Sequence, residues 1–498
     1  MRIDGVGRLA LGFVGLVAGC ATVPKARTQP EVPVLSPTRD EVLAKIERDI
    51  AAEVKAKRWP SLAIGIVYDG KLSWWRGFGE IDSASHAPVT DQTYFRYGSI
   101  TKTFTGLALL QLRDAGKLSL DDPLEKFIPE VKEVVYPTAE RPPIRLRHLV
   151  THTSAFPRAP SGLDYGDPAH VLTEADLIAA LDGMTLDGTP GAFDGYSNYA
   201  NCLSGIVIHR ASGVPYEDWI LNRIAAPLGL GIRWRQEDIP PGRLATGHSL
   251  GPKLKQDTVE VPRSWVMGAC NSCGGMFGSL SDLAGYAAFE LSPWPPRDAP
   301  ESPVASRATL RESQMPRGKS YGVNWGFDQD ATLGYLVGHS GEVAGYSAVL
   351  LMSPERGIAV VALLGFDDGV GDLQRLVKSS LTKLAPVFPR SPLPLAGSLR
   401  ARIDQLIGLL EPNAGPVPED FFTKEFVRFV LDKKETVEGH FSMLRQRGGR
   451  CRVSTLREST ANMAKLRLDC ARGAIEASVW LSTRSPHSIA GFGYDFPP

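Results

Sequence analysis

Residues 95–106 read FRYGSITKTFTG, and within them Ser99 stands three positions before Lys102. The pattern is S-x-x-K, which on a helix places both side chains on one face, one turn apart. A lysine at that position is able to take the proton of the serine hydroxyl, and the peptide dipoles at the start of the helix favour the alkoxide that forms. The stretch therefore predicts a serine nucleophile at the N-terminus of a helix.

The same pattern occurs a second time, because Ser380 and Lys383 are also spaced as S-x-x-K. A chain of this length and composition is expected to contain about one or two chance copies, so the surroundings must separate them. Residues 103–115 after Ser99 are apolar nearly all round, which is typical of a helix buried in the interior. Ser380 lies late on an amphipathic helix expected over residues 370–384, where a solvated face is a sufficient explanation. We predict Ser99 as the nucleophile.

Further stretches support a family resemblance. Residues 95–106 resemble the nucleophile segment of the class C β-lactamase superfamily, which includes esterases, DD-peptidases and D-amino-acid peptidases. Residues 149–154, LVTHTS, are similar to a loop of that family, although Ala155 stands where glycine is usual. Residues 196–198 resemble the second motif, Y-x-N, and residues 339–341 resemble the third motif in its H-x-G form rather than K-T-G.

The resemblance covers about residues 40–385 and implies a role for each matching position. Ser99 would attack a carbonyl carbon, while Lys102 and Tyr196 share the proton. The residues implied to bind substrate are Asn198, His339 and Gly341. By analogy with the family, the oxyanion hole would consist of the backbone N–H groups of Ser99 and Glu342. No metal or organic cofactor has a task in this scheme.

Two positions near these motifs have competing interpretations. Tyr199-Ala200-Asn201 is a second Y-x-N, and we prefer Tyr196 because Pro190-Gly191 precedes it as in the family. His152 is interpreted as structural, since the family's loop uses this residue for shape and not for proton transfer.

The third motif bears on substrate class, because no K-x-G occurs anywhere in the chain. A lysine there would be charged and would serve the carboxylate of β-lactams and D-Ala-D-Ala peptides. His339, with an ordinary pKa of about 6.5, would be mostly neutral at pH 7 and would gain charge towards pH 6. We therefore predict an esterase or peptidase-like serine hydrolase that works through an acyl-enzyme. The alternatives are a true β-lactamase or DD-peptidase and, third, a non-enzymatic binding lipoprotein.

The composition agrees with a large globular protein. The chain has 498 residues, of which 43% are hydrophobic, 22% charged and 8% aromatic. This length favours one large domain plus a smaller one. Lys plus Arg equals Asp plus Glu at 55 each, so no excess charge is present to attract nucleic acid. A small-molecule or peptide substrate is the expected partner.

The first 37 residues predict an export signal and a tether. Arg2 and Arg8 precede an apolar stretch over residues 9–18, and the run ending in Gly19-Cys20 resembles a bacterial lipobox. Residues 1–20 are then a lipoprotein signal peptide, Cys20 is lipidated, and the proline-rich residues 21–37 form the tether. The alternative is an ordinary signal with a chance cysteine. The protein is expected on the periplasmic side of a bacterial envelope, at the outer membrane.

Residues 38–387 are predicted to form the hydrolase domain, with an α/β (α+β) β-lactamase-like fold. The expected elements are a helix that begins with the capping box Thr38-x-x-Glu41, a hairpin of residues 61–68 and 71–79 joined at Asp69-Gly70, strands at 346–353 and 357–364, and a closing helix. We expect a five-stranded antiparallel sheet flanked by helices, plus an all-helical lobe.

Four prolines between Phe388 and Gly397 indicate a boundary, after which residues 398–498 predict a small α+β domain of unknown role. Its expected elements are two helices and three strands, at residues 451–455, 464–470 and 475–481.

The cysteines other than Cys20 suggest their own pairing. Cys451 and Cys470 each lie on the apolar face of an expected strand, which predicts a disulfide between them. Cys202 falls in an apolar helical run and is expected to be a buried thiol. Cys270 and Cys273 form a C-x-x-C without a second ligand pair, so we expect a tight disulfide or two free thiols and no metal.

Overall fold

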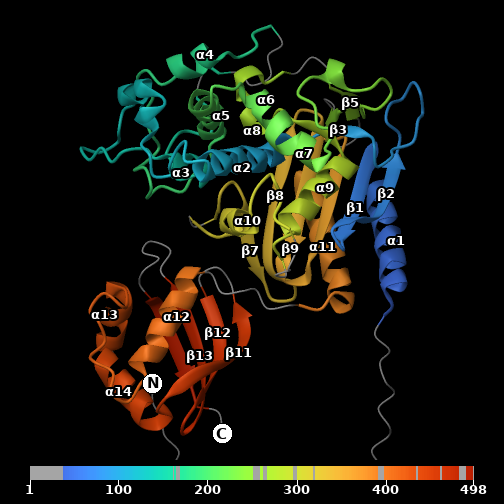
Figure 1. Cartoon of the computed structure of the whole chain (residues 1–498). Helices are drawn as coiled ribbons and strands as arrows, with labels where there is room; N and C mark the ends of the chain where they lie inside the picture. The colour runs from blue at the N-terminus through green and yellow to red at the C-terminus, as the bar shows by residue number, and fades with distance from the viewer. Residues whose placement is uncertain are drawn as a thin grey trace, which may run out of the picture. The chain divides into compact units, whose positions relative to one another are not determined.

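Figure 1 shows the computed structural model, which describes residues 37–496 except residue 161 and the segments 164–168, 251–257, 262–265, 295–299, 318–319, 391–396, 433–435, 460–462 and 482–488. The predicted signal peptide with Cys20, and the predicted tether apart from Pro37, lie outside the described residues. None of the helices that the structure describes is both long and apolar enough to cross a membrane.

A six-stranded antiparallel sheet forms the centre of the part of the chain before Phe388, in the order β2-β1-β10-β9-β8-β7. The strands are β1 (Ser61–Tyr68), β2 (Lys71–Gly79), β7 (Gly326–Asp330), β8 (Gly334–Val343), β9 (Tyr346–Ser353) and β10 (Ile358–Leu364). β1 and β2 are joined at Asp69-Gly70, both at positive φ, which suits a tight hairpin turn. The prediction of five strands is wrong by one, because the edge strand β7 reads GFDQD and has no apolar alternation.

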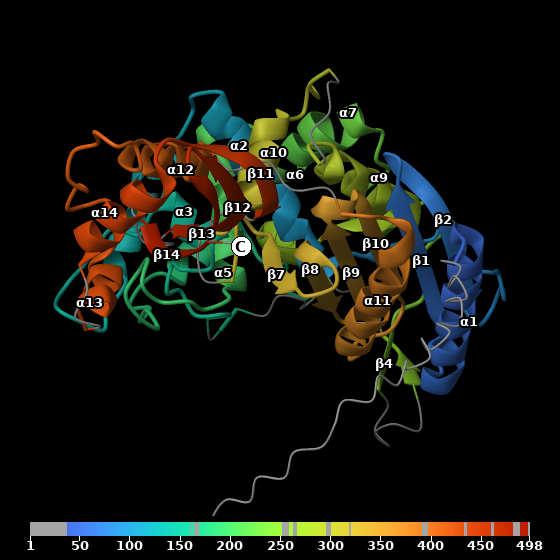
Figure 2. The same ribbon diagram turned by 90° about the horizontal axis from the view of Figure 1, so that it is seen from below.

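Each strand of the sheet centre is apolar on both faces, and two separate cores result. Leu62 and Ile64 pack with α1 (Arg39–Lys57) and α11 (Val370–Leu384) on one face. Ala63 and Val67 pack on the other face, in the core that includes α9 (Leu280–Leu291). Figure 2 shows the sheet lying between α9 on one side and α1 with α11 on the other. Alternate side chains of β1 therefore pack against helices on opposite faces of the sheet.

The capping box expected at the start of the first helix is present, since Thr38 and Glu41 bond reciprocally. The expectation for Ser380 is wrong, because its side chain is only 2% exposed and lies on the buried face of α11. Its hydroxyl donates to the carbonyl oxygen of Leu376, one turn earlier.

The helical lobe is built around α2 (Thr101–Asp114) and α5 (Asn198–Ser212). Every residue of α2 from Thr101 to Leu110 is buried, which confirms the helix expected in the interior. The remaining helices here are α3 (Leu146–Val150), α4 (Glu174–Ala179), α6 (Tyr216–Ile220), α7 (Ala226–Leu228), α8 (Asn271–Gly274) and α10 (Arg307–Gln314). Two short ladders complete this part: β3 (Tyr94–Arg96) with β6 (Phe277–Ser279), and β4 (His248–Leu250) with β5 (Thr258–Glu260).

The chain beyond Gly397 has a sheet and a core of its own. Its elements are α12 (Gly397–Leu409), α13 (Lys424–Asp432), α14 (Val437–Gly448), β11 (Cys451–Ser459), β12 (Met463–Cys470), β13 (Gly473–Leu481) and β14 (Ile489–Asp495). The strands are antiparallel in that order. Cys451 lies directly opposite Cys470 and forms a disulfide with it, the pair that the strand alternation predicts. The fourth strand, β14, was not expected, because its two glycines weaken the strand pattern.

Candidate active site

Ser99 lies in the one-turn segment η1 (Gly98–Ile100) that leads into α2. Gly98 takes a φ of +52°, and a Cβ atom there would come within 2.8 Å of the Glu342 backbone nitrogen. A side chain at this position would therefore be both strained and crowded. Glycine before the serine allows the turn to press against the third motif, and the Ser99 side chain remains partly exposed.

Lys102 is fully buried one turn after Ser99. Its Nζ lies 2.9 Å from Ser99 Oγ and 2.5 Å from the carbonyl oxygen of Cys273. The carbonyl orients the amine, and burial removes competing water. The structure thus forms the pair that the S-x-x-K spacing predicts, and it adds a backbone acceptor that no residue pattern signals.

The second motif stands at the start of α5. The Lys102 Nζ lies 5.0 Å from the centroid of the Tyr196 ring. The ring of His152 stacks on that of Tyr196, with ring centroids 4.2 Å apart. The Nδ1 atom of His152 accepts the Ser197 N–H at 3.2 Å. His152 therefore holds Tyr196 and the start of α5 in place, and burial lowers its pKa well below the ordinary value.

The competing Y-x-N points into the core. Tyr199 is fully buried and donates its hydroxyl to the Leu177 carbonyl oxygen at 2.6 Å. Asn201 Oδ1 accepts from Asn324 Nδ2 at 2.8 Å, and the same Nδ2 group donates to the Lys102 carbonyl oxygen at 2.7 Å. The second copy thus belongs to the packing behind α2, whereas Tyr196 faces Lys102.

The third motif lies on β8, against the turn that carries the nucleophile. A Cβ atom on Gly341 would lie 1.9 Å from the Tyr97 carbonyl oxygen and 2.9 Å from the Ser99 backbone nitrogen. Only glycine permits this approach. The backbone nitrogens of Ser99 and Glu342 are therefore brought to the same turn, as an oxyanion hole requires.

His339 is buried and neutral. Its Nδ1 lies 2.6 Å from the Ser340 carbonyl oxygen, so the neutral ring carries its proton there and presents Nε2 as an acceptor. Burial, followed by the charge of Lys102, lowers the pKa of His339 to about 4. The expectation of an ordinary histidine pKa at this position is wrong, because the sequence does not show how deeply the ring is buried.

Two buried acceptor atoms near the motifs have no hydrogen-bond partner among the described residues. They are Asn198 Oδ1 and His339 Nε2. Unpaired buried acceptors are costly, and a substrate N–H or O–H group would remove that cost. Both belong to the residues implied to bind substrate.

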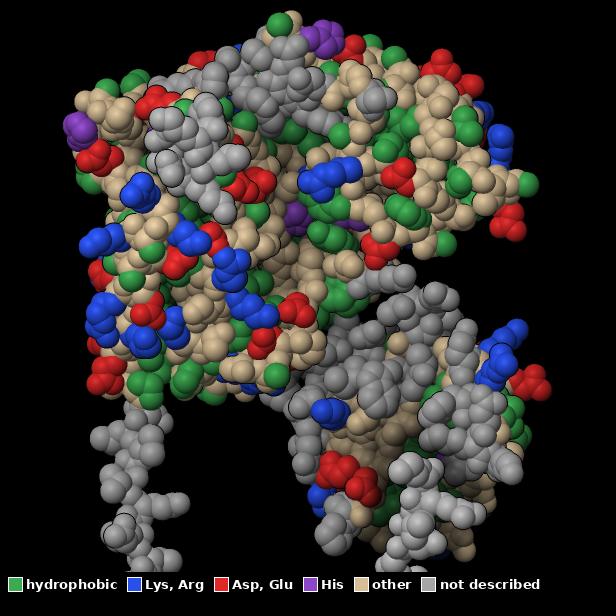
Figure 3. Space-filling view, turned by 180° about the vertical axis from the view of Figure 1, so that it is seen from behind, with side chains coloured by type: hydrophobic (Ala, Val, Ile, Leu, Met, Phe, Trp, Pro, Cys, Tyr) green, Lys and Arg blue, Asp and Glu red, His purple; other side chains and the backbone are tan. Residues whose placement is uncertain are grey.

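Tyr321 completes the site and was missed from the sequence, where no motif marks it. Its ring lies 4.5 Å from that of His152 edge-on and 6.0 Å from those of Tyr196 and His339. Burial raises the pKa of Tyr321 to about 12. Figure 3 shows histidine side chains at the back of a hollow, with a Lys or Arg side chain at its rim.

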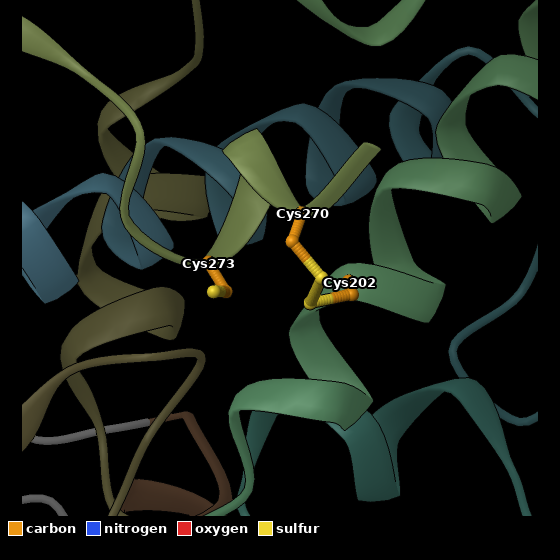
Figure 4. Close-up of side chains that lie close together, drawn as sticks. All are labelled: Cys202, Cys270 and Cys273. Carbon is orange, nitrogen blue, oxygen red and sulfur yellow. A yellow bond between two sulfur atoms is a disulfide. The ribbon is translucent and has the colours of Figure 1, made fainter. Parts of the chain in front are cut away.

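Three cysteines lie close together (Figure 4), with their sulfur atoms within 4.8 Å of one another, and the carbonyl oxygen of one of them, Cys273, accepts from Lys102. Cys202 on α5 forms a disulfide with Cys270, and Cys273 is a buried thiol. The expectation that Cys202 is a free thiol is therefore wrong. The expectation that Cys270 and Cys273 either bond to each other or are both free thiols is also wrong. The two bonded residues are 68 positions apart, so only the packing of α5 against η6 (Gly268–Cys270) brings them together.

Comparisons with known proteins agree on one family. The family described as Beta-lactamase matches residues 46–376. Beta-lactamase-like protein 2 of Dictyostelium discoideum is 27% identical over 309 residues, which are 61% of this chain and 54% of the relative. Protein flp of Staphylococcus aureus (strain N315) is 26% identical over 322 residues, 64% of this chain and 62% of the relative. The chain thus spans a little over half of the length of these relatives.

Two further similarities add detail. A Beta-lactamase of Escherichia coli (strain K12) is 30% identical over 197 residues, 39% of this chain and 48% of the relative. The octameric penicillin-binding protein homologue from Pyrococcus abyssi has a similar structure, with a TM-score of 0.58 and 23% identity over 89% of this chain and 97% of that one. At this identity the likeness concerns the fold.

Proposed function

The chain belongs to the β-lactamase family, and on this premise we propose that it is a serine hydrolase that cleaves an ester or amide through an acyl-enzyme. The observation that carries the proposal is the contact of 2.9 Å between the partly exposed Ser99 hydroxyl and the fully buried Lys102 amine. A lysine amine at this distance from a serine hydroxyl is placed to exchange a proton with it.

The steps follow from the arrangement of the side chains. Ser99 Oγ attacks the carbonyl carbon while its proton passes to the neutral amine of Lys102. The negative charge on the carbonyl oxygen is stabilised by the N–H groups of Ser99 and Glu342. Tyr196 gives its hydroxyl proton to the leaving group and recovers a proton from Lys102, which returns both groups to their starting state. The acyl-enzyme is then hydrolysed by a water that the same two groups activate.

The state of His339 favours esters and peptide-like substrates over β-lactams. Its ring is buried and its pKa is lowered to about 4, so the third motif presents a neutral acceptor at neutral pH where K-T-G would present a cation. A true β-lactamase or DD-peptidase is the second candidate, and the E. coli relative, a β-lactamase 30% identical over its matched region, favours it.

Two labels, used side by side, test the proposal. A fluorophosphonate and a fluorescent penicillin are each added to the wild type, to Ser99→Ala and to Ser380→Ala. We expect the fluorophosphonate to label the wild type and Ser380→Ala but not Ser99→Ala, and the penicillin to label weakly or not at all. Strong penicillin labelling at Ser99 would establish the second candidate. Absence of both labels from the wild type would reject the hydrolase.

We also propose that lipidated Cys20 anchors the protein on the periplasmic side of the envelope. The two disulfides support an exported protein, since such bonds persist outside the cytosol. Labelled palmitate should enter the full chain and should not enter Cys20→Ala. Equal labelling of both would reject the anchor.

A further inference from the structure

We propose that Arg158 binds a carboxylate of the substrate, so that the hydrolase acts on esters or amides that carry an anionic group away from the scissile carbonyl. This inference rests on the proposed function and assigns its substrate class.

Arg158 is held beside the second motif. Its guanidinium carbon lies 5.0 Å from the centroid of the Tyr196 ring, and its side chain is exposed. Its carbonyl oxygen accepts the backbone N–H of Asn198 at 2.9 Å. The backbone of Arg158 is therefore fixed to the first residue of α5, while the guanidinium lies against the ring of the proposed proton carrier.

Packing against an aromatic ring orders the guanidinium without using its hydrogens. A planar guanidinium that stacks on a ring keeps its N–H edge free for a carboxylate, and it binds such a group in a bidentate manner. In the part of the chain that the structure describes, Arg158 takes part in no ion pair. The side chain is thus ordered in advance, which lowers the entropic cost of binding an anion.

The charge of Arg158 reaches across the site. Burial raises the pKa of Tyr321, the neighbouring Tyr196 and Asp194 add to this rise, and the charge of Arg158 opposes it. Burial, Asp367 and Asp368 likewise raise the pKa of Glu342, and Arg158 opposes that shift. The charge of Arg158 thus acts on two groups that lie on different segments of the chain.

The other cations of the site are not available to a substrate anion. Lys102 is fully buried and bonded to Ser99 and Cys273. Burial keeps His152 and His339 neutral at neutral pH. Arg158, by contrast, is exposed and lies against the ring of Tyr196.

The test compares two esters that differ by one charge: the mono-4-nitrophenyl ester of adipic acid and its methyl-capped, neutral counterpart. The variants are Arg158→Gln, Arg158→Lys and the control Arg141→Gln, which alters another exposed arginine whose guanidinium carbon lies 5.9 Å from the centroid of a tyrosine ring, that of Tyr136. The quantity measured is the ratio of kcat/KM for the anionic ester to that for the neutral ester.

We expect Arg158→Gln to lower this ratio by about tenfold, the size of one partly exposed charged hydrogen bond. Arg158→Lys should lower it less, and Arg141→Gln should leave it unchanged. Calorimetry supplies a readout without turnover: in a Ser99→Ala background, Arg158→Gln should weaken the binding of the anionic ester by a similar factor and that of the neutral ester little.

The unfavourable outcomes are distinct. If the wild type hydrolyses both esters and Arg158→Gln leaves the ratio unchanged, the inference fails and the proposed function stands. If Arg158→Gln slows both esters equally, Arg158 only positions Tyr196 and the inference also fails. If the wild type hydrolyses neither ester and takes up no fluorophosphonate, the proposed function fails and the inference fails with it.

Discussion

The chain contains the pattern S-x-x-K twice, and the two copies behave differently. Lys102 Nζ lies 2.9 Å from Ser99 Oγ, inside the helical lobe. In the second copy, Ser380 bonds to the carbonyl oxygen of its own helix, and Lys383 Nζ lies 2.7 Å from the neighbouring Ser379. Spacing on a helix therefore permits the contact without producing it. Burial of the lysine, and a carbonyl that aims its amine at the serine, make the difference.

The strongest challenge to this comparison is to remove each serine in turn. Ser99→Ala should lower kcat by about 10⁴-fold or more, because nucleophile and base act as one unit. Ser380→Ala should leave kcat within about twofold and cost about 1 kcal/mol of stability, the net value of one hydrogen bond. Steady-state kinetics and thermal denaturation of both variants measure these effects. Similar losses of activity in the two variants would show that the contact at Ser99 is not the catalytic one.

The two copies of Y-x-N extend the comparison. Tyr196→Phe should lower kcat by about 10²- to 10⁴-fold, since it removes a proton carrier next to Lys102. Tyr199→Phe should leave kcat nearly unchanged and cost about 1–3 kcal/mol of stability, because the buried Leu177 carbonyl loses its donor. Kinetics and urea denaturation separate the two effects. A catalytic loss confined to Tyr199→Phe would reverse the assignment.

The side chains of the catalytic centre could be predicted because they are tied to local patterns. The S-x-x-K at Ser99 places its two side chains one turn apart within four residues. The buried helix after Ser99 and the hairpin at Asp69-Gly70 follow from periodicity and turn chemistry. These features are present in the structure as the sequence predicts.

The parts that were missed depend on contacts between distant segments. The Cys273 carbonyl that holds Lys102 carries no signal in its side chain. Cys202 finds Cys270 only after α5 packs against η6, and Tyr321 enters the site from a segment without a motif. The burial of His339, which sets its pKa, likewise results from the assembled core. Sequence patterns report local geometry, and these features are not local.

Removing each of the two disulfides in turn gives a comparison of the same kind, with an expected effect on kcat that is smaller than those of the serine and tyrosine variants. Replacing Cys202 and Cys270 together by alanine should lower kcat by up to about 10²-fold, because the segment that aims Lys102 is no longer tied to α5. Replacing Cys451 and Cys470 together should leave kcat unchanged and cost its own unit roughly 3 kcal/mol in the chain-entropy model. Circular dichroism, with kinetics on the same samples, measures both. Equal kcat values in the two double variants would show that the first disulfide has no influence on the site.

The smallest expected effect is the pH dependence that His339 gives to the preference for anionic esters. Its size distinguishes a buried histidine from a solvated one. A histidine with the ordinary pKa of about 6.5 would gain charge towards pH 6 and improve the binding of anionic substrates. The pKa of His339 is lowered to about 4 by burial and by the charge of Lys102, so protonation is disfavoured until the pH approaches that value. Because kcat/KM reports the ionisation of the free enzyme, the ratio of kcat/KM for anionic esters to that for neutral esters should stay within about twofold from pH 8 to about pH 5.5.

His339→Lys should raise that ratio by supplying the missing cation, whereas Ser380→Ala should leave it unchanged at every pH. A rise in the wild-type ratio centred near pH 6 would mean that the ring is solvated when substrate arrives. The neutral third motif would then no longer favour esters over β-lactams.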